Sequence, residues 1–410
     1  MSTNLLEGVR VLDLTNVLAG PFAGYQLALM GADVLKVEAL PDGDLARRLG
    51  ASPELSDRRM GISFLAQNSE KRSIRLNLKT KRGNEIFRAL VERHDVVLEN
   101  FRPGVLDRLG LGWDVLSQIN PRLIYCAVSG FGQTGPLRNR PAYDQIIQGM
   151  SGLMSVTGDP GTSPLRVGAP ISDTIGGFAA AFAIAASLVR RGRTGEGAFL
   201  DVSMLEATLT AMGWVASDYL VGGVDPVPMG NENRTAAPSG TFRTADGDFN
   251  IAANKHEQFE QLCHLIGRPE LLDDPRFAAR EARKANRAAL KAEIESALIQ
   301  HSNAHWDEIL PAFGIPGAPV MDVPTALASA QVVERGLIST LSVDALEGVT
   351  GAAVGAGGSI RLLGAPVHVD GSAVRPETGP PVLGEHTSSV LAELGYSATD
   401  IDELYAEGVV

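Results

Sequence analysis

One aspartate in this sequence is well placed to act as a nucleophile. Asp173 lies in VGAPISDTIGGF (167–178), at the start of an alanine-rich helix predicted over 172–190. The positive end of a helix dipole favours a carboxylate, so we expect Asp173 to stay ionised and to be able to attack an activated acyl group. Gly176 and Gly177 would let a bulky substrate approach the backbone. An ordinary helix N-cap is the alternative explanation, because aspartate is common there.

A cluster of basic residues is the second candidate for chemistry. The cluster lies within residues 71–82, and two further basic residues, Arg102 and Arg108, come after it in ENFRPGVLDR. The chain as a whole has 36 Lys and Arg against 48 Asp and Glu, a net charge of −12, so general nucleic-acid or anionic-membrane binding is not expected. Local basic charge in an acidic protein fits a phosphorylated small molecule, and a solvated basic face is the alternative. The cluster comprises Lys71, Arg72, Arg75, Lys79, Lys81 and Arg82.

A β–α–β unit is predicted at the start of the chain. Strands are expected over 8–15 and 32–37, joined by the turn NVLAGP (16–21) and a helix over 22–30. Such units imply a parallel sheet. Glu38 stands where a dinucleotide-binding fold would hold a ribose, but the turn has no GxGxxG fingerprint. A nicotinamide enzyme is therefore the weaker interpretation of this unit.

Alternating strand and helix patterns continue along the chain and predict an α/β fold. The first domain is predicted over 1–220, and 221–240, rich in Gly, Pro and Asn, is predicted as a linker. A smaller domain is predicted over 241–329, and 330–410 is expected to return to the first. Further strands are expected over 74–78, 95–99, 123–129 and 195–203, helices over 83–93, 204–214, 257–310 and 388–394, and a hairpin turn at Asp246-Gly247.

The remaining sequence patterns argue against a metal site, a disulfide framework, a membrane span and a signal peptide. His301 and His305 are spaced for one helix face, but no acidic or cysteine ligand adjoins them, so no metal is expected. Cys126 and Cys263 have neither metal-ligand spacing nor the pattern of a disulfide framework. The apolar run 176–189 is short for a membrane span, and MSTNLLEG lacks the pattern of a signal peptide. We expect a cytoplasmic enzyme.

Several segments in order resemble the class III CoA-transferases, the carnitine and formyl-CoA type also called CaiB/BaiF. They are GVRVLDLTNVLAGPFAG, GADVLKVE, KRSIRLNLK, ENFRPGVLDRLG, GQTGP, the segment around Asp173, GEGAFLDVSMLEA, GIPGAPV and LGEH. The resemblance covers essentially the whole chain. It implies a Rossmann-like large domain formed by both chain ends, a smaller inserted α+β domain, and an interlocked homodimer.

The resemblance also implies the site. The nucleophile is Asp173, Tyr143 and Asp144 lie near the substrate, and coenzyme A or acyl-CoA is a substrate, with no tightly bound cofactor. Where the family often has a basic residue after the second strand, this chain has Ala39. Family contacts to CoA fall on Leu18, Ala19, Leu76, Lys79, Asn100, Phe101 and Arg108.

The implied reaction moves CoA from an acyl-CoA to a free carboxylic acid through an anhydride and an aspartyl-CoA thioester. Formyl-CoA transferases have a glutamine at the place of Leu18 and a glycine run in the small domain, and this chain has neither. These differences argue against oxalate and formate. Arg166, Arg234 and Arg243 could bind a second carboxylate, which favours small dicarboxylates such as succinate, mesaconate or citramalate, with branched or carnitine-like acids as alternatives.

Two other functions remain as alternatives. The 2-methylacyl-CoA racemases of the same superfamily pair an aspartate with a histidine, but the place of that histidine is Tyr143, a poor base near neutral pH. A non-catalytic CoA-binding subunit is disfavoured by the presence of Asp173.

Overall fold

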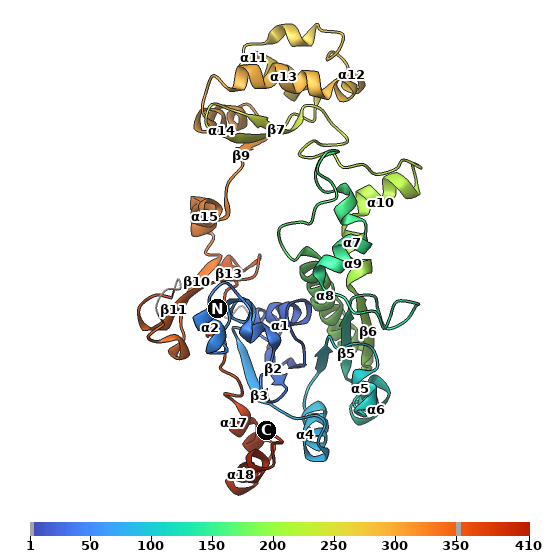
Figure 1. Ribbon diagram of the computed structural model, residues 1–410, viewed down its shortest axis with the longest axis vertical. Helices are drawn as coiled ribbons and strands as arrows, with labels where there is room; N and C mark the ends of the chain where they lie inside the picture. The colour runs from blue at the N-terminus through green and yellow to red at the C-terminus, as the bar shows by residue number, and fades with distance from the viewer. Residues whose placement is uncertain (1–3, 350–353) are drawn as a thin grey trace. The chain divides into compact units, whose positions relative to one another are not determined.

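A six-stranded parallel sheet organises the first part of the protein (Figure 1). Its order is β3-β2-β1-β4-β5-β6, so the strands that follow β1 in the chain are placed first on one side of it and then on the other. This order confirms the predicted α/β fold and creates a switch point between β1 and β4, where parallel sheets commonly bind ligands. The strands are β1 (Arg10–Asp13), β2 (Asp33–Glu38), β3 (Lys71–Arg75), β4 (Val96–Glu99), β5 (Ile124–Ser129) and β6 (Ala198–Ser203).

Helices cover both faces of the sheet because successive side chains of a buried strand point to opposite faces. On one face, Val11 packs with residues of α1 (Ala19–Leu29), α8 (Ile171–Thr194) and α9 (Met204–Ala211). On the other face, Leu12 and Leu35 pack with residues of further helices. These are α4 (Lys81–Glu92), α5 (Val105–Arg108), α6 (Trp113–Ile119), α17 (Thr387–Glu393) and α18 (Ala398–Ala406).

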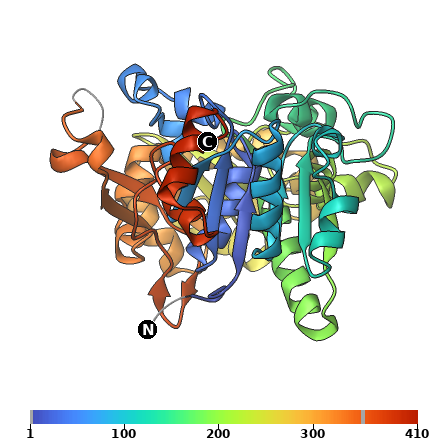
Figure 2. The same cartoon turned by 90° about the horizontal axis from the view of Figure 1, so that it is seen from below.

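Helices of the C-terminal segment pack against this sheet. Figure 2 shows its helices, in red, beside the blue strands. The backbone N–H of His386 donates to Ser73 O (2.8 Å), and the Arg75 N–H donates to Thr387 Oγ1 (3.1 Å). An antiparallel pair, β10 (Ile338–Ser342) and β11 (Ser359–Leu363), precedes these helices and was not foreseen. Both chain ends therefore contribute to the unit that contains the sheet.

The computed structural model describes residues 4–349 and 354–410, which divide into two compact units. The first consists of Met1–Leu153, Arg166–Leu220 and Ala330–Val410, and the second of Met154–Leu165 and Val221–Ser329. The second unit thus includes residues 154–165 and 221–240, which the sequence analysis assigned to the first domain and to a linker.

The second unit is a three-stranded antiparallel sheet covered by helices. The predicted hairpin is confirmed: β7 (Ser239–Arg243) and β8 (Asp248–Ala252) flank Asp246-Gly247, and β9 (Gly317–Pro319) pairs with β8. Phe249, Phe259 and Trp306 are central to its core. Its α-helices are α11 (His256–Leu265), α12 (Arg280–Ala285), α13 (Arg287–Leu298), α14 (Asn303–Ala312) and α15 (Val323–Ala328).

Several boundaries differ from the expectations. The strand expected over 74–78 is β3, which begins at Lys71 and includes part of the basic cluster. The helix expected over 204–214 is two helices, α9 and α10 (Gly213–Leu220). The apolar helix α8 is longer than expected and is long and apolar enough to cross a membrane by length and composition. Its residues Ala180 and Ile184 lie in the core beneath the sheet, and 33% of its apolar window is buried in the single chain.

Candidate active site

Asp173 lies in the first turn of α8 but does not cap it. The N-cap residue is Pro170, and no side chain of the helix itself provides a cap. Instead, Oδ1 of Asp144 accepts hydrogen bonds from the backbone N–H groups of Ser172 (2.8 Å) and Asp173 (3.4 Å). The N-cap explanation of Asp173 is therefore wrong, because a neighbouring carboxylate satisfies the orphan N–H groups that begin the helix.

Asp144 is held firmly in this capping role. It is the first residue of α7 (Asp144–Met150) and is buried. Its Oδ2 accepts a hydrogen bond from Gln148 Nε2 (2.7 Å) and lies 3.6 Å from a guanidinium nitrogen of Arg166. The structure thus places Asp144 beside Asp173, and places Arg166, predicted to bind a substrate carboxylate, next to the capping carboxylate.

The carboxylate of Asp173 differs from Asp144 in having no partner. Among the residues that the structure describes, it accepts no hydrogen bond and forms no ion pair, although the side chain is largely buried. Burial, with a smaller contribution from Asp144, raises the pKa of Asp173 to about 7. The expectation that the helix dipole keeps this group fully ionised is therefore wrong, because desolvation dominates. A largely buried carboxylate without a partner is typical of a functional site.

Asp173 lines a cavity of about 260 Å³ at the switch point of the sheet. The cavity includes five further residues that the family resemblance places at the CoA or substrate site. They come from the start of α1 and the residue before it, from the segment after β4 and from the residue before α7: Leu18, Ala19, Asn100, Phe101 and Tyr143. Tyr143 is 66% exposed, so its side chain is accessible to a ligand.

Three arginines give the cavity its charge. Arg102, Arg138 and Arg140 line it, and none of them forms an ion pair within the described part of the chain. Asp173 is the one acidic residue in its lining. A cavity that is locally cationic in a protein of net charge −12 is suited to an anionic substrate.

A second cavity of about 530 Å³ shares Arg102, Pro103 and Arg138 with the first. It contains Arg108 and an aromatic group formed by Trp113, Tyr125 and Phe199, whose ring centroids lie 5.7–6.3 Å apart. The lining also contains three acidic residues, Glu99, Asp107 and Asp114. The arginines and aromatic rings are the groups that suit a nucleotide.

Two predicted CoA contacts lie outside both cavities. Leu76 is 1% exposed, and its side chain belongs to the core of the sheet. Lys79 is exposed and forms no ion pair among the described residues, so its charge remains available. Only backbone groups of Leu76 could therefore meet a ligand.

Most of the basic cluster has internal partners. Lys71 is buried and donates to Asp13 Oδ2 (2.9 Å), and burial lowers its pKa to about 8. Arg72 pairs with Asp33, and Arg82 pairs with Glu407. A solvated basic face and a shared phosphate site are both poor descriptions of these residues, because Lys71 and Arg72 on β3 and Arg82 on α4 pair with acidic groups far away in the sequence.

Glu38 and the two glycines have structural roles that the sequence did not reveal. Glu38 is 3% exposed and pairs through both oxygens with buried Arg47 (2.7 Å each), so it does not present itself to a ribose. A Cβ at Gly177 would lie 2.6 Å from Ala19 O, and one at Gly176 would lie 3.0 Å from Met204 Cγ. These glycines therefore allow α8 to pack closely on neighbouring helices, and they do not open the backbone to a substrate.

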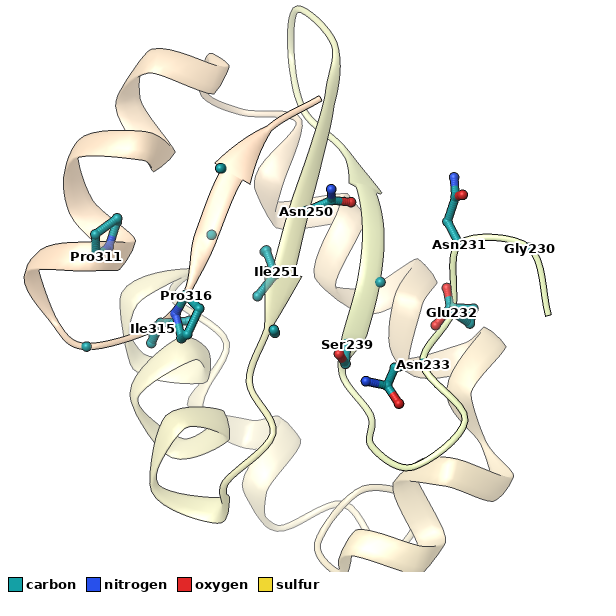
Figure 3. A pocket seen from close by; sticks show the side chains of 15 residues that line it. Gly230, Asn231, Glu232, Asn233, Ser239, Asn250, Ile251, Pro311, Ile315 and Pro316 are labelled. Atoms are coloured by element: carbon teal, nitrogen blue, oxygen red, sulfur yellow. The ribbon is translucent and has the colours of Figure 1, made fainter. Parts of the chain in front are cut away.

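The second unit contains a larger groove of about 900 Å³ (Figure 3). Asn231, Glu232 and Asn233 border it on one side, and Asn250 and Ile251 belong to β8. Its only ionisable side chain is that of Glu232, which lies 3.3 Å from Lys291 Nζ. The groove is lined by more apolar than polar surface and, within the residues described, holds no arrangement of nucleophile and base.

The predicted histidine pair has packing partners. The rings of His301 and His305 stack with centroids 4.0 Å apart, and both contact the edge or face of Trp306. Of the other residues proposed for a second carboxylate, Arg243 belongs to β7 in the second unit and Arg234 precedes that strand. Neither lines the cavity that holds Asp173.

Comparison with known proteins identifies the class. The model of the CoA-transferase family III matches residues 6–387. An acetyl-CoA:oxalate CoA-transferase of Acetobacter aceti is 43% identical over 333 residues, 81% of this chain and 85% of that protein. A succinyl-CoA:glutarate CoA-transferase of Mus musculus is 36% identical and covers 99% of this chain and 90% of its own. The chain belongs to the CoA-transferase family III.

The solved structures agree with this assignment. A CaiB/BaiF family protein from Brucella suis superposes with a TM-score of 0.81 at 36% identity, over 96% of this chain and 100% of that one. The expected resemblance is confirmed, and the protein is a CoA-transferase that moves CoA from an acyl-CoA to a carboxylic acid. The relatives named as transferases favour this activity over racemisation.

Arg138 and Arg140, in the segment LRNRPAYD, line the cavity but were not predicted from the sequence. A signal was present: both residues lie between the turn GQTGP and Tyr143, which was itself predicted to be near the substrate. Two arginines beside a predicted substrate contact could have been considered as anion ligands.

Proposed function

We propose that Asp173 is the nucleophile of the transferase. The ionised carboxylate attacks the thioester carbonyl of the donor, the C–S bond breaks, and a mixed anhydride and CoA thiolate form. The thiolate then attacks the aspartyl carbonyl, which releases the donor acid and leaves an aspartyl-CoA thioester. The acceptor carboxylate attacks this thioester to form a second anhydride, and the thiolate then takes the acceptor acyl group and restores Asp173. Among the described residues, the Asp173 carboxylate has no hydrogen-bond or ion-pair partner, and this observation supports the role most strongly.

We further propose that the two adjoining cavities hold the two ends of the acyl-CoA. The thioester lies in the smaller cavity beside Asp173, between the Leu18–Ala19 backbone and Phe101. Arg102 and Arg138, which line both cavities, span the junction. The nucleotide then lies in the larger one, where Arg108 meets a phosphate. Lys79 and the backbone of Leu76 complete the contacts at the exposed rim.

The acceptor is proposed to be a small dicarboxylate. Two relatives described above act, by their names, on oxalate and on glutarate. Oxalate therefore remains among the candidates even though this chain has Leu18 and lacks the glycine run. Arg140 lines only the cavity that contains Asp173, so its guanidinium is available for a carboxylate that does not react. Arg140 therefore replaces Arg166, Arg234 and Arg243 as the residue proposed to bind the second carboxylate of the acceptor.

We also propose that the enzyme is a cytoplasmic, interlocked homodimer. Phe182 on α8 is 77% exposed and Trp214 on α10 is 86% exposed in the single chain. Large apolar side chains with this exposure favour burial against a second copy. We expect light scattering to give a particle of twice 43.3 kDa at micromolar concentration, and a monomer at that concentration would contradict the interlocked arrangement.

The activity is tested by offering acetyl-CoA or succinyl-CoA with oxalate, glutarate, mesaconate, citramalate or carnitine in deuterated buffer. Mass spectrometry follows both the exchanged thioester and deuterium at the α-carbon. We expect a new acyl-CoA with at least one dicarboxylate and no deuterium uptake. Deuterium uptake without thioester exchange would instead support the racemase, and exchange only with carnitine would overturn the dicarboxylate assignment.

A further inference from the structure

The turn between β1 and α1 is held by side chains from other segments. Lys36 Nζ, fully buried on β2, donates to Thr15 O (2.8 Å). The Asn100 side chain accepts from Asn16 N and donates to Asn16 O, both at 2.8 Å. Two successive peptide units are thus fixed before the chain reaches the cavity.

The next residue, Val17, has a conformation that valine rarely adopts. Its φ is 69°, in the left-handed region where a β-branched side chain is unfavourable. Asp44 Oδ1 accepts from Val17 N (2.9 Å), and Gln67 Nε2 donates to Val17 O (2.6 Å). Such a conformation persists only when its surroundings determine it.

Asp44 is itself rigidly fixed. It is 1% exposed, and its Oδ2 lies 2.9 Å from Lys36 Nζ. Its backbone N–H donates to Glu38 Oε2 (3.0 Å), and its Oδ1 also accepts from Ala46 N (2.9 Å). Lys36 and the hydrogen bonds to Oδ1 lower the pKa of Asp44 despite its burial, so it remains a charged acceptor.

We propose that Asp44 and Gln67 are positioning residues that hold Val17 in the left-handed conformation and thereby present the Leu18–Ala19 backbone to coenzyme A. Neither residue lines the cavity, so each acts through the turn. The inference rests on the proposed CoA site. It adds that the affinity for CoA depends on the backbone geometry of Val17.

A double-mutant cycle with coenzyme A as the probe tests this proposal. Asp44→Asn is measured in the natural background and in a Val17→Gly background by calorimetry. Glycine adopts positive φ without strain, so it needs no clamp. We expect Asp44→Asn to weaken CoA binding at least tenfold with Val17 present and less than threefold with glycine at that position. We also expect the KM for acyl-CoA to rise while kcat changes by less than threefold.

Matched variants keep the test decisive. Asp42→Asn, two residues away, serves as a control because Asp42 is half-exposed and pairs with Arg48 at the surface. If Asp44→Asn does not fold, the same cycle is run with Gln67→Leu, which leaves no charge unpaired. Equal losses in both backgrounds, or unchanged CoA affinity in a folded variant, would overturn the proposal. If the natural enzyme itself bound no CoA, the proposed CoA site would fail as well, whereas binding by the natural enzyme leaves that site standing.

Discussion

Two largely buried carboxylates in the same unit, Glu38 and Asp173, differ in whether a cation is paired with them. Glu38 is paired with Arg47 through both oxygens, and Arg47 with its hydrogen bonds keeps the pKa of Glu38 below its usual value despite burial. Asp173 forms no ion pair within the described part of the chain, and burial raises its pKa to about 7. A paired carboxylate fixes the fold, and an unpaired one is available for chemistry. In this unit, an ion-pair partner therefore distinguishes the carboxylate that stabilises the fold from the carboxylate proposed to react.

The largest effect should come from removing the unpaired carboxylate. Asp173→Asn keeps the shape of the side chain but cannot form the anhydride. We expect transferase kcat to fall by at least about 10³-fold, a magnitude typical for loss of a nucleophile. CoA affinity and the dimer should be unchanged, as calorimetry and light scattering would show. Retention of a tenth of the activity would remove Asp173 from the chemistry.

The two carboxylates should affect stability with opposite signs. Glu38→Gln leaves buried Arg47 without its counter-charge and should lower the free energy of unfolding by about 3 kcal/mol or more. The stability that Asp173 contributes is present below the pKa of about 3.8 that it has in the unfolded chain and is lost as pH rises through about 7. Asp173→Asn should therefore stabilise the protein at pH 8, by up to about 4 kcal/mol, with little effect near pH 4. Urea unfolding at pH 4 and pH 8 measures the free energy of unfolding of both variants. Destabilisation at pH 8 by Asp173→Asn would contradict the conclusion that burial raises the pKa of Asp173.

Arg140 allows a sharper test of the cavity's cationic lining. Arg140→Gln should raise the KM for a dicarboxylate acceptor about 10- to 100-fold, because a charge-assisted contact contributes roughly 1.5–3 kcal/mol. The KM for acyl-CoA should change little. An equal rise in both constants would place Arg140 at the CoA instead. Arg122→Gln, at a distant exposed arginine, is the matched control.

The rim of the proposed CoA site should give a smaller effect. Lys79→Ala and Arg108→Ala should each raise the KM for acyl-CoA, by about tenfold or less, because exposed charges are screened. Added salt should weaken CoA binding in the natural enzyme. Lys81→Ala is the control, since Lys81 is exposed and close to Lys79 but pairs with Glu85. If Lys79→Ala and Arg108→Ala had the same KM for acyl-CoA as Lys81→Ala, Lys79 and Arg108 would be ordinary surface residues.

The smallest expected effect concerns the pH profile. Transfer requires ionised Asp173, so kcat/KM for acyl-CoA should fall as pH drops below about 7. Asp144→Asn removes the charge that raises the pKa of Asp173, so this fall should move to lower pH. The shift should be modest, because burial is the larger cause. A shift to higher pH would mean that capping by Asp144 matters more than its charge.

The sequence predicted features that depend on local pattern. Alternating strands and helices indicated the parallel sheet, and Asp173 was recognised at the start of an apolar helix. Features that depend on distant partners were missed. Lys71 looked solvent-exposed because its partner Asp13 lies 58 residues away. The cap of α8 was missed because Asp144 lies 29 residues before Asp173. Burial, which determines the pKa of Asp173, depends on packing that no local pattern reveals.

The central claim is that Asp173 becomes covalently acylated. The natural enzyme is incubated with acetyl-CoA or succinyl-CoA, trapped with borohydride or hydroxylamine, and digested for peptide mass spectrometry. Borohydride would reduce an aspartyl-CoA thioester to an alcohol, and hydroxylamine would convert it to a hydroxamate. We predict a mass change in the peptide that contains Asp173, dependent on acyl-CoA and missing in Asp173→Asn. Active transfer with an unmodified Asp173 peptide, or with the label on another residue, would contradict the account.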